Sequence, residues 1–335
     1  MSLRRSLAHG ARLAVLLFIV AAHMLLERPA AGEKLTLGVS AVGAGQGGLF
    51  MAVEGRFFER QGLDVELLFV GSGTEATQAL LSGRLAASLV GGPSPVNATL
   101  AGGELVWVAG LVNVLPYVLV VSPEVTTPAE LKGKQLGVNR LGSAAELAAR
   151  FMLARLGLNP QTDVTLLQAG EQAARLAALQ ARSIQATLLE PPGTVVARRL
   201  GFRELASLAP MKLYFPHEAL ATSRRFVREQ PETLRKLVTG LVLGTHAFKT
   251  RRDEGIQALR KYLKVDDPEA LAETYAMSAS LIESKPYMPI AVVQTVLDML
   301  ATSDPRARSA RAEEFVDMRF VTELDRSGFI DRLYR

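Results

Sequence analysis

Short apolar runs alternate with amphipathic segments along the first two thirds of the chain. The runs KLTLGVS (Lys34–Ser40), LDVELLFV and LAASLVGG predict strands, with helices expected between them around residues 49–58 and 74–82. Two further runs, ELVWVAGLVN and YVLVVS, predict strands on either side of Pro116. Runs of this length bounded by Gly and Pro are typical of buried strands in a parallel or mixed sheet. The alternation predicts an α/β architecture.

A second unit of the same kind follows. KQLGV, VTLLQAG and IQATLLEPP predict strands, and helices are expected over residues 144–156 and 171–183. From about Ala219 onward strand patterns almost vanish, and a helical C-terminal region is predicted, starting near Pro231. At 335 residues, 49% of them apolar, the chain is long enough for two lobes with real cores.

Four of the predicted strand ends carry glycine together with polar residues. They are SAVGAGQGG, GSGT, GGPSPVN and NRLGS, the last leading directly into a helix. The first N–H groups of a helix have no partner within it, and the peptide dipoles add roughly half a positive charge there. Ligands in open α/β sheets gather at such ends. The guanidinium group of Arg140 would add a bidentate hydrogen-bond donor suited to a carboxylate, sulfonate or phosphate.

Each end taken alone has a plainer interpretation. A serine at a helix start is most often an N-cap that stabilises the helix by about 1 kcal/mol, and Gly142 would then only serve a turn. Four such ends in one chain favour a ligand site. Glu190, at the end of a predicted strand, is a candidate cleft carboxylate that could equally pair with an arginine. Trp107 lies within an apolar strand, which favours core packing.

Several chemistries are excluded or disfavoured by the residues present. GSGT is not followed by the Gly-Lys-Ser/Thr of a phosphate loop, and GAGQGG lacks the glycine spacing of a dinucleotide site. Cysteine is absent, which excludes disulfides, thiolate metal sites and cysteine nucleophiles. Outside the first 32 residues only His217 and His246 remain, too far apart for a recognisable metal pattern. We therefore predict no catalytic residues, no metal and no cofactor.

The first 32 residues have the pattern of an export signal. Arg4, Arg5 and Arg12 precede the apolar stretch LAVLLFIVAAHMLL, and PAAG supplies small residues for cleavage near Gly32. An uncleaved anchor is the alternative, although the stretch is shorter than the roughly 20 residues of a spanning helix. Residues 33–335 carry 34 basic and 32 acidic side chains, and this balance does not indicate the basic surface of a nucleic-acid-binding protein.

Several of these stretches resemble periplasmic solute-binding proteins of the nitrate, sulfonate and taurine type, a family that shares a domain with thiamine-pyrimidine synthases. Residues Ala52 to Val65 match a sequence motif of this family, with Arg56 in the variable position before Phe57-Phe58. PAELKGKQLGV, LLEPP, SRRFVREQPETLRKLV and FVDMRFVTELDRSGFIDRLY match in order and spacing over nearly all of residues 34–335. The resemblance implies a type II periplasmic binding fold, in which two α/β lobes are joined by a two-strand hinge. It implies residues 33–115 and 213–335 for the first lobe and 116–212 for the second.

The resemblance also implies a ligand cleft between the lobes. Residues carried over to it one by one are Ser40, Gly45, Gln46, Ser72, Ser94, Asn113, Arg140, Gly142, Ser143, Glu190 and Tyr214, with Phe215 beside the second crossing. We predict that the solute is anionic or polar, and that an anionic group is held by Arg140 and the helix start at Gly142 and Ser143.

The implied function is capture of a small solute in the periplasm and its delivery to the permease and ATPase subunits of an ABC importer. The protein is then expected to be a monomer that meets the membrane only through the permease. The alternatives are a binding protein that serves a sensor kinase or another transporter and, less favoured because cysteine is absent, a pyrimidine-synthase-like enzyme.

Overall fold

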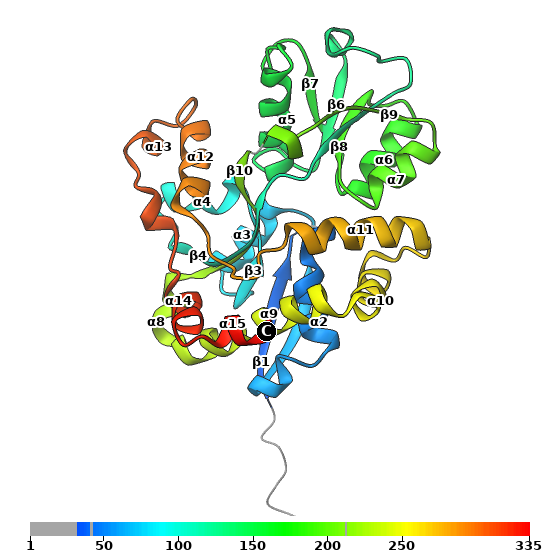
Figure 1. The fold of residues 1–335 in the computed structure, drawn as a ribbon. Helices are drawn as coiled ribbons and strands as arrows, with labels where there is room; N and C mark the ends of the chain where they lie inside the picture. Colours follow the sequence, from blue (N-terminus) through cyan, green and yellow to red (C-terminus); the bar gives the residue numbers. More distant parts are fainter. Residues whose placement is uncertain (1–31, 41–42, 212) are drawn as a thin grey trace, which may run out of the picture. The chain divides into compact units, whose positions relative to one another are not determined.

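The computed structural model describes residues 32–40, 43–211 and 213–335 (Figure 1). The predicted export signal, apart from Gly32, lies outside these residues. Within them, two five-stranded sheets form. The first has the order β2 (Leu63–Phe69), β1 (Glu33–Val39), β3 (Ala87–Leu89), β10 (Tyr214–Ser223), β4 (Leu105–Val114). The second has the order β7 (Thr165–Gln168), β6 (Gln135–Val138), β8 (Ala186–Leu189), β5 (Val118–Val121), β9 (Arg203–Ser207).

The two sheets share one plan. In each, the fourth strand runs antiparallel to both of its neighbours, β10 between β3 and β4, and β5 between β8 and β9. The chain passes from β4 to β5 through Leu115–Tyr117 and returns from β9 to β10 through η4 (Ala209–Met211). Both sheets therefore connect through two short crossings, as the two-strand hinge of the predicted fold requires.

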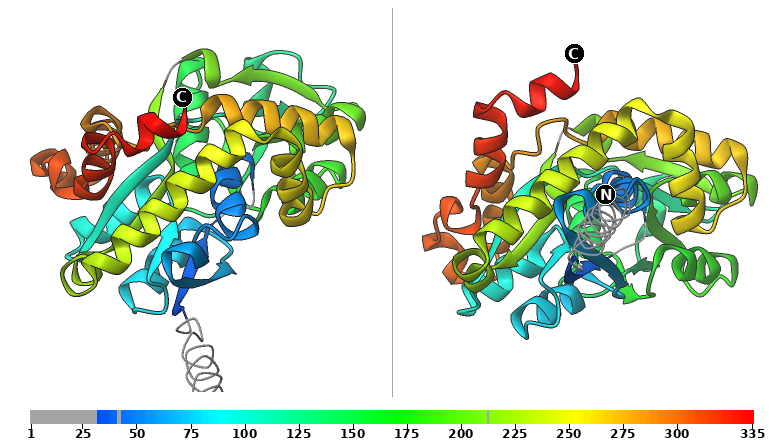
Figure 2. Two further views of the ribbon diagram at one scale, coloured as in Figure 1. Left: turned by 60° about the horizontal axis from the view of Figure 1, so that its bottom comes forward. Right: turned by 90° about the horizontal axis from the view of Figure 1, so that it is seen from below.

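Helices cover both sheets. Around the first are α2 (Gly47–Glu54), α3 (Gly73–Leu81) and α4 (Pro93–Leu100), and around the second α5 (Ala144–Arg155), α6 (Gln172–Gln180) and α7 (Gly193–Arg199). The C-terminal part is helical, as predicted: α8 (Arg224–Glu229), α9 (Pro231–Thr250), α10 (Arg252–Leu263), α11 (Pro268–Leu281), α12 (Ile290–Leu300), α13 (Pro305–Ser309), α14 (Arg319–Arg326) and α15 (Phe329–Leu333). Figure 2 shows α14 beside the long α9, where Arg235 donates to Glu323 at 2.8 Å.

Short single-turn 3₁₀ segments fill the remaining connections: η1 (Ala44–Gln46), η2 (Glu59–Gln61), η3 (Pro128–Leu131) and η5 (Ala312–Phe315). Within the described ranges, no helix combines the length and apolar character needed to cross a membrane.

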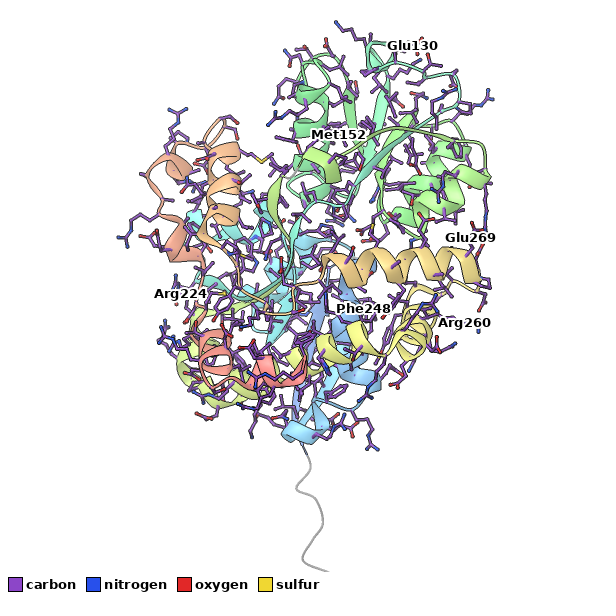
Figure 3. The ribbon with its side chains drawn as sticks, viewed as in Figure 1. Glu130, Met152, Arg224, Phe248, Arg260 and Glu269 are labelled. Atoms are coloured by element: carbon purple, nitrogen blue, oxygen red, sulfur yellow. The ribbon has the colours of Figure 1, made fainter. Side chains whose placement is uncertain are left out.

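Packing follows the apolar pattern. Trp107 is 1% exposed, and its indole N–H donates to the carbonyl of Val90 at 2.9 Å, which confirms its predicted core position. Helices α2 and α9 approach closely because small residues face each other: a Cβ on Gly244 would lie 2.5 Å from Ala52 Cβ and from the carbonyl oxygen of Gly48. Phe248, labelled in Figure 3, is fully buried near the same crossing. This packing holds the start of α2 against the rest of the first sheet.

The sequence pattern did not predict β10. The sequence pattern predicts almost no strand from about Ala219 onward, whereas β10 continues to Ser223 in the middle of the first sheet. The sequence YFPHEALATS contains Pro, His and Glu, so it lacks the uninterrupted apolar run of a central strand. The expected helix at residues 49–58 is also shorter, because α2 ends at Glu54 with Gly55 as its C-cap.

Candidate functional site

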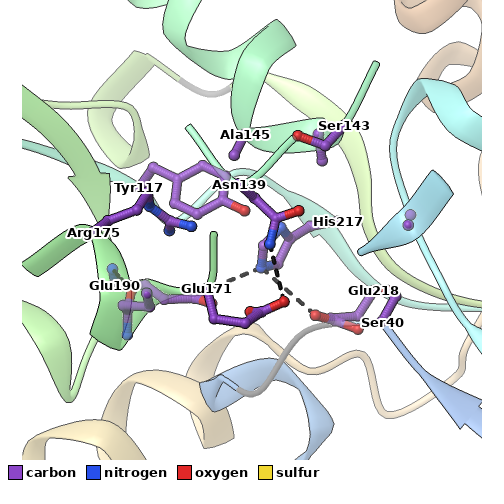
Figure 4. Close-up of a pocket in the computed structure, with 14 residues that line it drawn as sticks. Ser40, Tyr117, Asn139, Ser143, Ala145, Glu171, Arg175, Glu190, His217 and Glu218 are labelled. Atoms are coloured by element: carbon purple, nitrogen blue, oxygen red, sulfur yellow. Dashed lines mark hydrogen bonds and ion pairs between the residues drawn. The ribbon is translucent and has the colours of Figure 1, made fainter. Parts of the chain in front are cut away.

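A small pocket lies between the two sheets, where strand ends from both meet helix starts (Figure 4). Ser40 follows β1, Asn139 follows β6 and Glu190 follows β8, while β10 contributes His217 and Glu218. The cavity measures about 60 Å³. It lies at the carboxyl ends of parallel strands, the usual ligand position in such sheets.

The pocket contains a buried cluster of ionisable side chains. His217 Nε2 lies 3.2 Å from Glu190 Oε2 and 3.8 Å from Glu218 Oε1, and all three residues are at most 6% exposed. His217 and Glu218 are consecutive, and consecutive side chains of a regular strand point to opposite faces. The pairing of β10 with β4 shifts register on either side of Glu218, and such irregularities redirect side chains beside binding sites.

Gln46 supports the cluster from the start of α2. Its amide nitrogen donates to Glu218 Oε1 at 2.5 Å, and its amide oxygen accepts from the backbone N–H of Gly43 at 2.8 Å. A Cβ on Gly45 would collide with the Glu218 side chain. The glycine-rich loop is therefore needed for close approach to this carboxylate.

Carboxylates outnumber basic groups in this cluster, in which Glu190 and Glu218 flank His217. Burial raises the pKa of Glu218 to about 7; His217 opposes this shift and Glu190 adds to it. Burial lowers the pKa of His217, but Glu190 and Glu218 outweigh it and hold the pKa above its ordinary value. Burial also raises the pKa of Glu171, against a hydrogen bond from Asn139 at 3.0 Å. A third carboxylate thus adds to the two beside His217.

A buried arginine forms the opposite wall. Burial lowers the pKa of Arg175, with Tyr117, Glu171 and Glu190 opposing. Its three guanidinium nitrogens donate within the second half, to Thr187 Oγ1 at 3.2 Å and to the carbonyls of Gly170 at 2.8 Å and Leu188 at 3.1 Å. Arg175 is therefore held in place by neutral acceptors and not by a carboxylate.

In the part of the chain that the structure describes, two pocket-lining residues have a buried polar atom without a hydrogen-bond partner, Asn139 Oδ1 and His217 Nδ1. Among the described residues, His217 Nδ1 is buried and makes no hydrogen bond. The imidazole packs edge-on against Tyr117, with ring centroids 5.3 Å apart. Burying a polar group without a partner costs free energy, so this nitrogen is a candidate contact for a ligand.

The predicted helix starts meet at the same place. Gly73 and Ser143, at the starts of α3 and α5, both line the pocket. The hydroxyls of Ser72 and Ser143 cap their own helices, accepting from Glu75 N–H at 3.2 Å and Glu146 N–H at 3.4 Å. Both hydroxyls are therefore N-caps. The two helix starts contribute to the pocket because they lie in its lining.

Of the residues predicted from the sequence, Ser40, Ser143 and Glu190 line the pocket. Gly45 and Gln46 touch it indirectly, through Glu218. Ser94 donates to the carbonyl of Gly142 at 2.8 Å, joining the two halves beside the pocket. Asn113 is used elsewhere, donating to the carbonyl of Tyr287 at 2.9 Å.

Arg140 and Tyr214 are also among the predicted residues that lie outside the pocket lining. The Arg140 side chain is 49% exposed and forms an ion pair with Glu75 of α3. Tyr214 is 56% exposed at the start of β10, while the neighbouring Phe215 is fully buried in the core. Sequence reasoning missed Tyr117, Glu171, Arg175, His217 and Glu218. The available signal was the pair His217-Glu218, because two ionisable residues interrupt an otherwise apolar run.

In residues 32–40, 43–211 and 213–335, no group of three or more His, Cys, Asp or Glu side chains is arranged to hold a metal ion.

Polar contacts join the two halves on both sides of the pocket. On one side, Asn139 donates to the carbonyl of Gly71 at 3.2 Å, next to the Arg140–Glu75 pair. On the other, Arg198 and Arg199 of α7 pair with Glu273, Asp267 and Glu269 around α11. Figure 3 labels Glu269, at the N-terminal end of α11. These contacts connect the two halves around the pocket.

Comparison with known proteins agrees with this architecture. A model of the NMT1-like family matches residues 28–264. No curated protein sequence matches the chain. Three solved structures are similar over most of their length. A protein from Bordetella bronchiseptica RB50 is 22% identical, with a TM-score of 0.78, and covers 89% of this chain and 98% of its own.

The second is the alkanesulfonate-binding protein SsuA from Xanthomonas axonopodis pv. citri bound to MOPS, 21% identical, with a TM-score of 0.70, covering 86% of this chain and 99% of its own. The third is the periplasmic nitrate-binding protein NrtA from Synechocystis PCC 6803. It is 14% identical, with a TM-score of 0.75, and covers 88% of this chain and 89% of its own. At these identities the likeness establishes the periplasmic-binding-protein fold.

Proposed function

The chain belongs to the NMT1-like family, and from this premise and the geometry of the pocket we propose that it is a periplasmic solute-binding protein of an ABC importer. The two sheets with their helices act as two lobes, residues 33–115 with 213–335 and residues 116–212, that close over one small solute. The export signal in residues 1–32 would deliver the protein to the periplasm, where the permease recognises the closed form.

The observation that carries this proposal is the composition of the pocket wall. Glu190 follows a strand of the second sheet, His217 and Glu218 lie on a strand of the first, and the contacts between them join the two lobes. A binding site completed by closure is what ligand-driven domain closure requires. In this proposal the solute is bound and released unchanged.

The chemistry of the wall favours a solute that brings positive charge or several N–H donors. Three carboxylates, Glu171, Glu190 and Glu218, line the pocket. Arg175 is the one arginine or lysine among the lining residues, and its nitrogens already donate to neutral acceptors. Burial of carboxylates is costly, and a protonated amine, amidine or guanidine would add a cationic donor to the partners that they already have, His217, Gln46 and Asn139.

This proposal changes the expected role of Arg140. An anionic group held by Arg140 was predicted from the sequence, but Arg140 pairs with Glu75 outside the pocket lining. We assign this pair to lobe closure. A wholly anionic solute would face three carboxylates, together with His217 and Arg175, in a site of about 60 Å³, and like charges repel more strongly in a buried site than in bulk water.

The test is a binding screen on the exported, purified protein. Isothermal titration and thermal shift are run with guanidinium, methylammonium and benzamidine, and in parallel with nitrate, methanesulfonate and acetate. We expect the cations to bind and to raise the melting temperature. If only the anions bind, solute capture stands and the cationic assignment is wrong. If neither set binds and a broad metabolite panel also fails, the binding function itself is refuted.

An importer role has a separate test. Deleting the gene should abolish uptake of the solute identified by the screen, and uptake should return with the wild-type gene. A strain that keeps full uptake but loses a transcriptional response to the solute would instead indicate service to a sensor kinase.

A further inference from the structure

A second, much larger cavity adjoins the central pocket. It measures about 790 Å³, and Glu171 and Gln172 of the α6 start line both cavities. The two cavities therefore share the wall that Glu171 and Gln172 form. We call the larger space the side chamber.

The side chamber is lined mainly by apolar side chains. They are Phe69, Leu176, Val196, Tyr262, Leu263 and Val265. Phe69 stands out because 43% of it is exposed at the end of β2. A large exposed aromatic ring gains free energy when an apolar surface covers it.

An aromatic cluster fixes the orientation of this wall. Phe50 stacks on Tyr262 with ring centroids 4.2 Å apart and planes 10° from parallel, and Phe69 lies 6.2 Å from Tyr262. The Tyr262 hydroxyl donates to Glu54 at 2.7 Å, and Lys261 Nζ at the chamber edge is also 2.8 Å from Glu54. These contacts hold Tyr262 in place at the chamber wall, and the Lys261 charge is balanced by a neighbouring carboxylate.

The side chamber, like the central pocket, is built from both lobes. Leu176 and Val196 come from α6 and α7 of the second lobe, whereas Phe69, Tyr262 and Val265 come from β2 and the region around the α10 end in the first. Closing the lobes therefore assembles this apolar space at the same time as the ionisable cluster.

We propose that the side chamber binds an apolar tail of the solute, so that the solute is an amphipathic cation: an amine, amidine or guanidine head carrying an alkyl or aryl group. This inference rests on the proposed function, because it assigns the head to the central pocket. The central cavity of about 60 Å³ accommodates a head group only, while a space of 790 Å³ has the size of an ordinary small-molecule site.

The test uses a homologous series of n-alkylguanidinium ions from methyl to octyl, measured by isothermal titration. Burial of each methylene in the side chamber should improve affinity by up to about fourfold. In the variant Ala173→Phe, a bulky ring is placed on an exposed position of α6 that lines the chamber. Affinity for methylguanidinium should stay within twofold, and the gain per methylene should be lost.

The matched control is Ala174→Phe, an exposed position on the same helix that lines neither cavity. It should keep the full dependence on chain length. A second variant, Phe69→Ser, should reduce the gain per methylene from the opposite wall.

The outcomes separate this inference from the proposed function. If methylguanidinium binds but chain length has no effect, or if Ala173→Phe leaves the dependence intact, the tail assignment is wrong while the head site stands. If no guanidinium binds but n-alkanesulfonates do, the cationic head is wrong. A chain-length gain for sulfonates that Ala173→Phe removes would then still support the apolar chamber.

Discussion

His217 Nε2 lies 3.2 Å from Glu190 Oε2, and this contact joins a strand of the first sheet to the end of a strand of the second. Both side chains are at most 6% exposed. The contact places an ionisable pair from two lobes inside one pocket, so ligand charge, proton binding and lobe closure all act on the same atoms.

Replacing Glu190 by Gln should weaken binding of guanidinium or a short alkylammonium by about 10- to 100-fold. The amide keeps the size of the carboxylate but loses its charge, and hydrogen bonds to charged groups contribute about 1.5–3 kcal/mol. Isothermal titration measures the loss. Glu66→Gln, on the exposed side of β2, is the control and should bind as wild type. An affinity for cations that survives Glu190→Gln would refute the assignment of the head group.

The solute-free protein should become less stable as pH rises from about 4.5 to 7 on account of Glu218. Its pKa is raised from 4.5 to about 7 in the folded state, so the native protein binds more protons than the unfolded chain in this window. The free energy of unfolding then falls with rising pH, by on the order of 1–3 kcal/mol. The raised pKa of His217 acts in the same direction, because its contribution is present below pH 6.5 and lost as pH rises through the folded value.

Glu218→Gln should flatten this dependence, because the side chain no longer titrates. Denaturant unfolding at several pH values provides the measurement. Affinity for a cationic probe should change in the opposite sense in the wild type, increasing as Glu218 loses its proton. A wild-type slope that Glu218→Gln leaves unchanged would show that other groups control it.

Arg140→Ala and Glu75→Ala should each reduce solute affinity by no more than about fivefold, and the double variant should be no weaker than either single one. The pair is half exposed, and exposed ion pairs contribute about 0.2–1 kcal/mol. Titrations of all four proteins complete a double-mutant cycle. If Arg140 instead contacts the solute, Arg140→Ala should cost at least tenfold while Glu75→Ala costs little.

A saturating cationic solute should reduce the radius of gyration of the protein in solution. The contacts that hold the lobes closed, beyond the pocket itself, include exposed arginine–carboxylate pairs such as Arg198–Glu273. Without solute these exposed pairs contribute little, and a bound cation would add contacts to carboxylates of both lobes. Small-angle scattering with and without the probe measures the change, and an unchanged radius at saturation would count against ligand-driven closure.

Gly244→Val should lower the free energy of unfolding by about 1–3 kcal/mol, because added methyl groups in a packed core force neighbours apart. The site for a Cβ is already 2.5 Å from Ala52 Cβ and from the backbone of Gly48. Denaturant unfolding measures the effect. Lys236→Val, at an exposed position of the same helix, introduces the same side chain without the collision and should be close to neutral.

The order of strands and helices could be predicted from the sequence because each depends on local patterns. Apolar runs bounded by glycine and proline identified most strands, and Ser72 and Ser143 were placed correctly at helix starts. β10 was missed because a central strand with Pro, His and Glu loses its apolar signature. Its burial depends on strands β3 and β4, which lie more than a hundred residues earlier.

The sequence by itself therefore determined the α/β class, the glycine-bearing strand ends and the helical C-terminal region, since these follow from the spacing of residues near one another in the chain. Only the tertiary structure decided the chemistry of the site. Glu190, His217 and Glu218 meet because a register shift in β10 and the approach of two sheets bring them together. The charge of a pocket is a sum over distant residues, and no local pattern contains it.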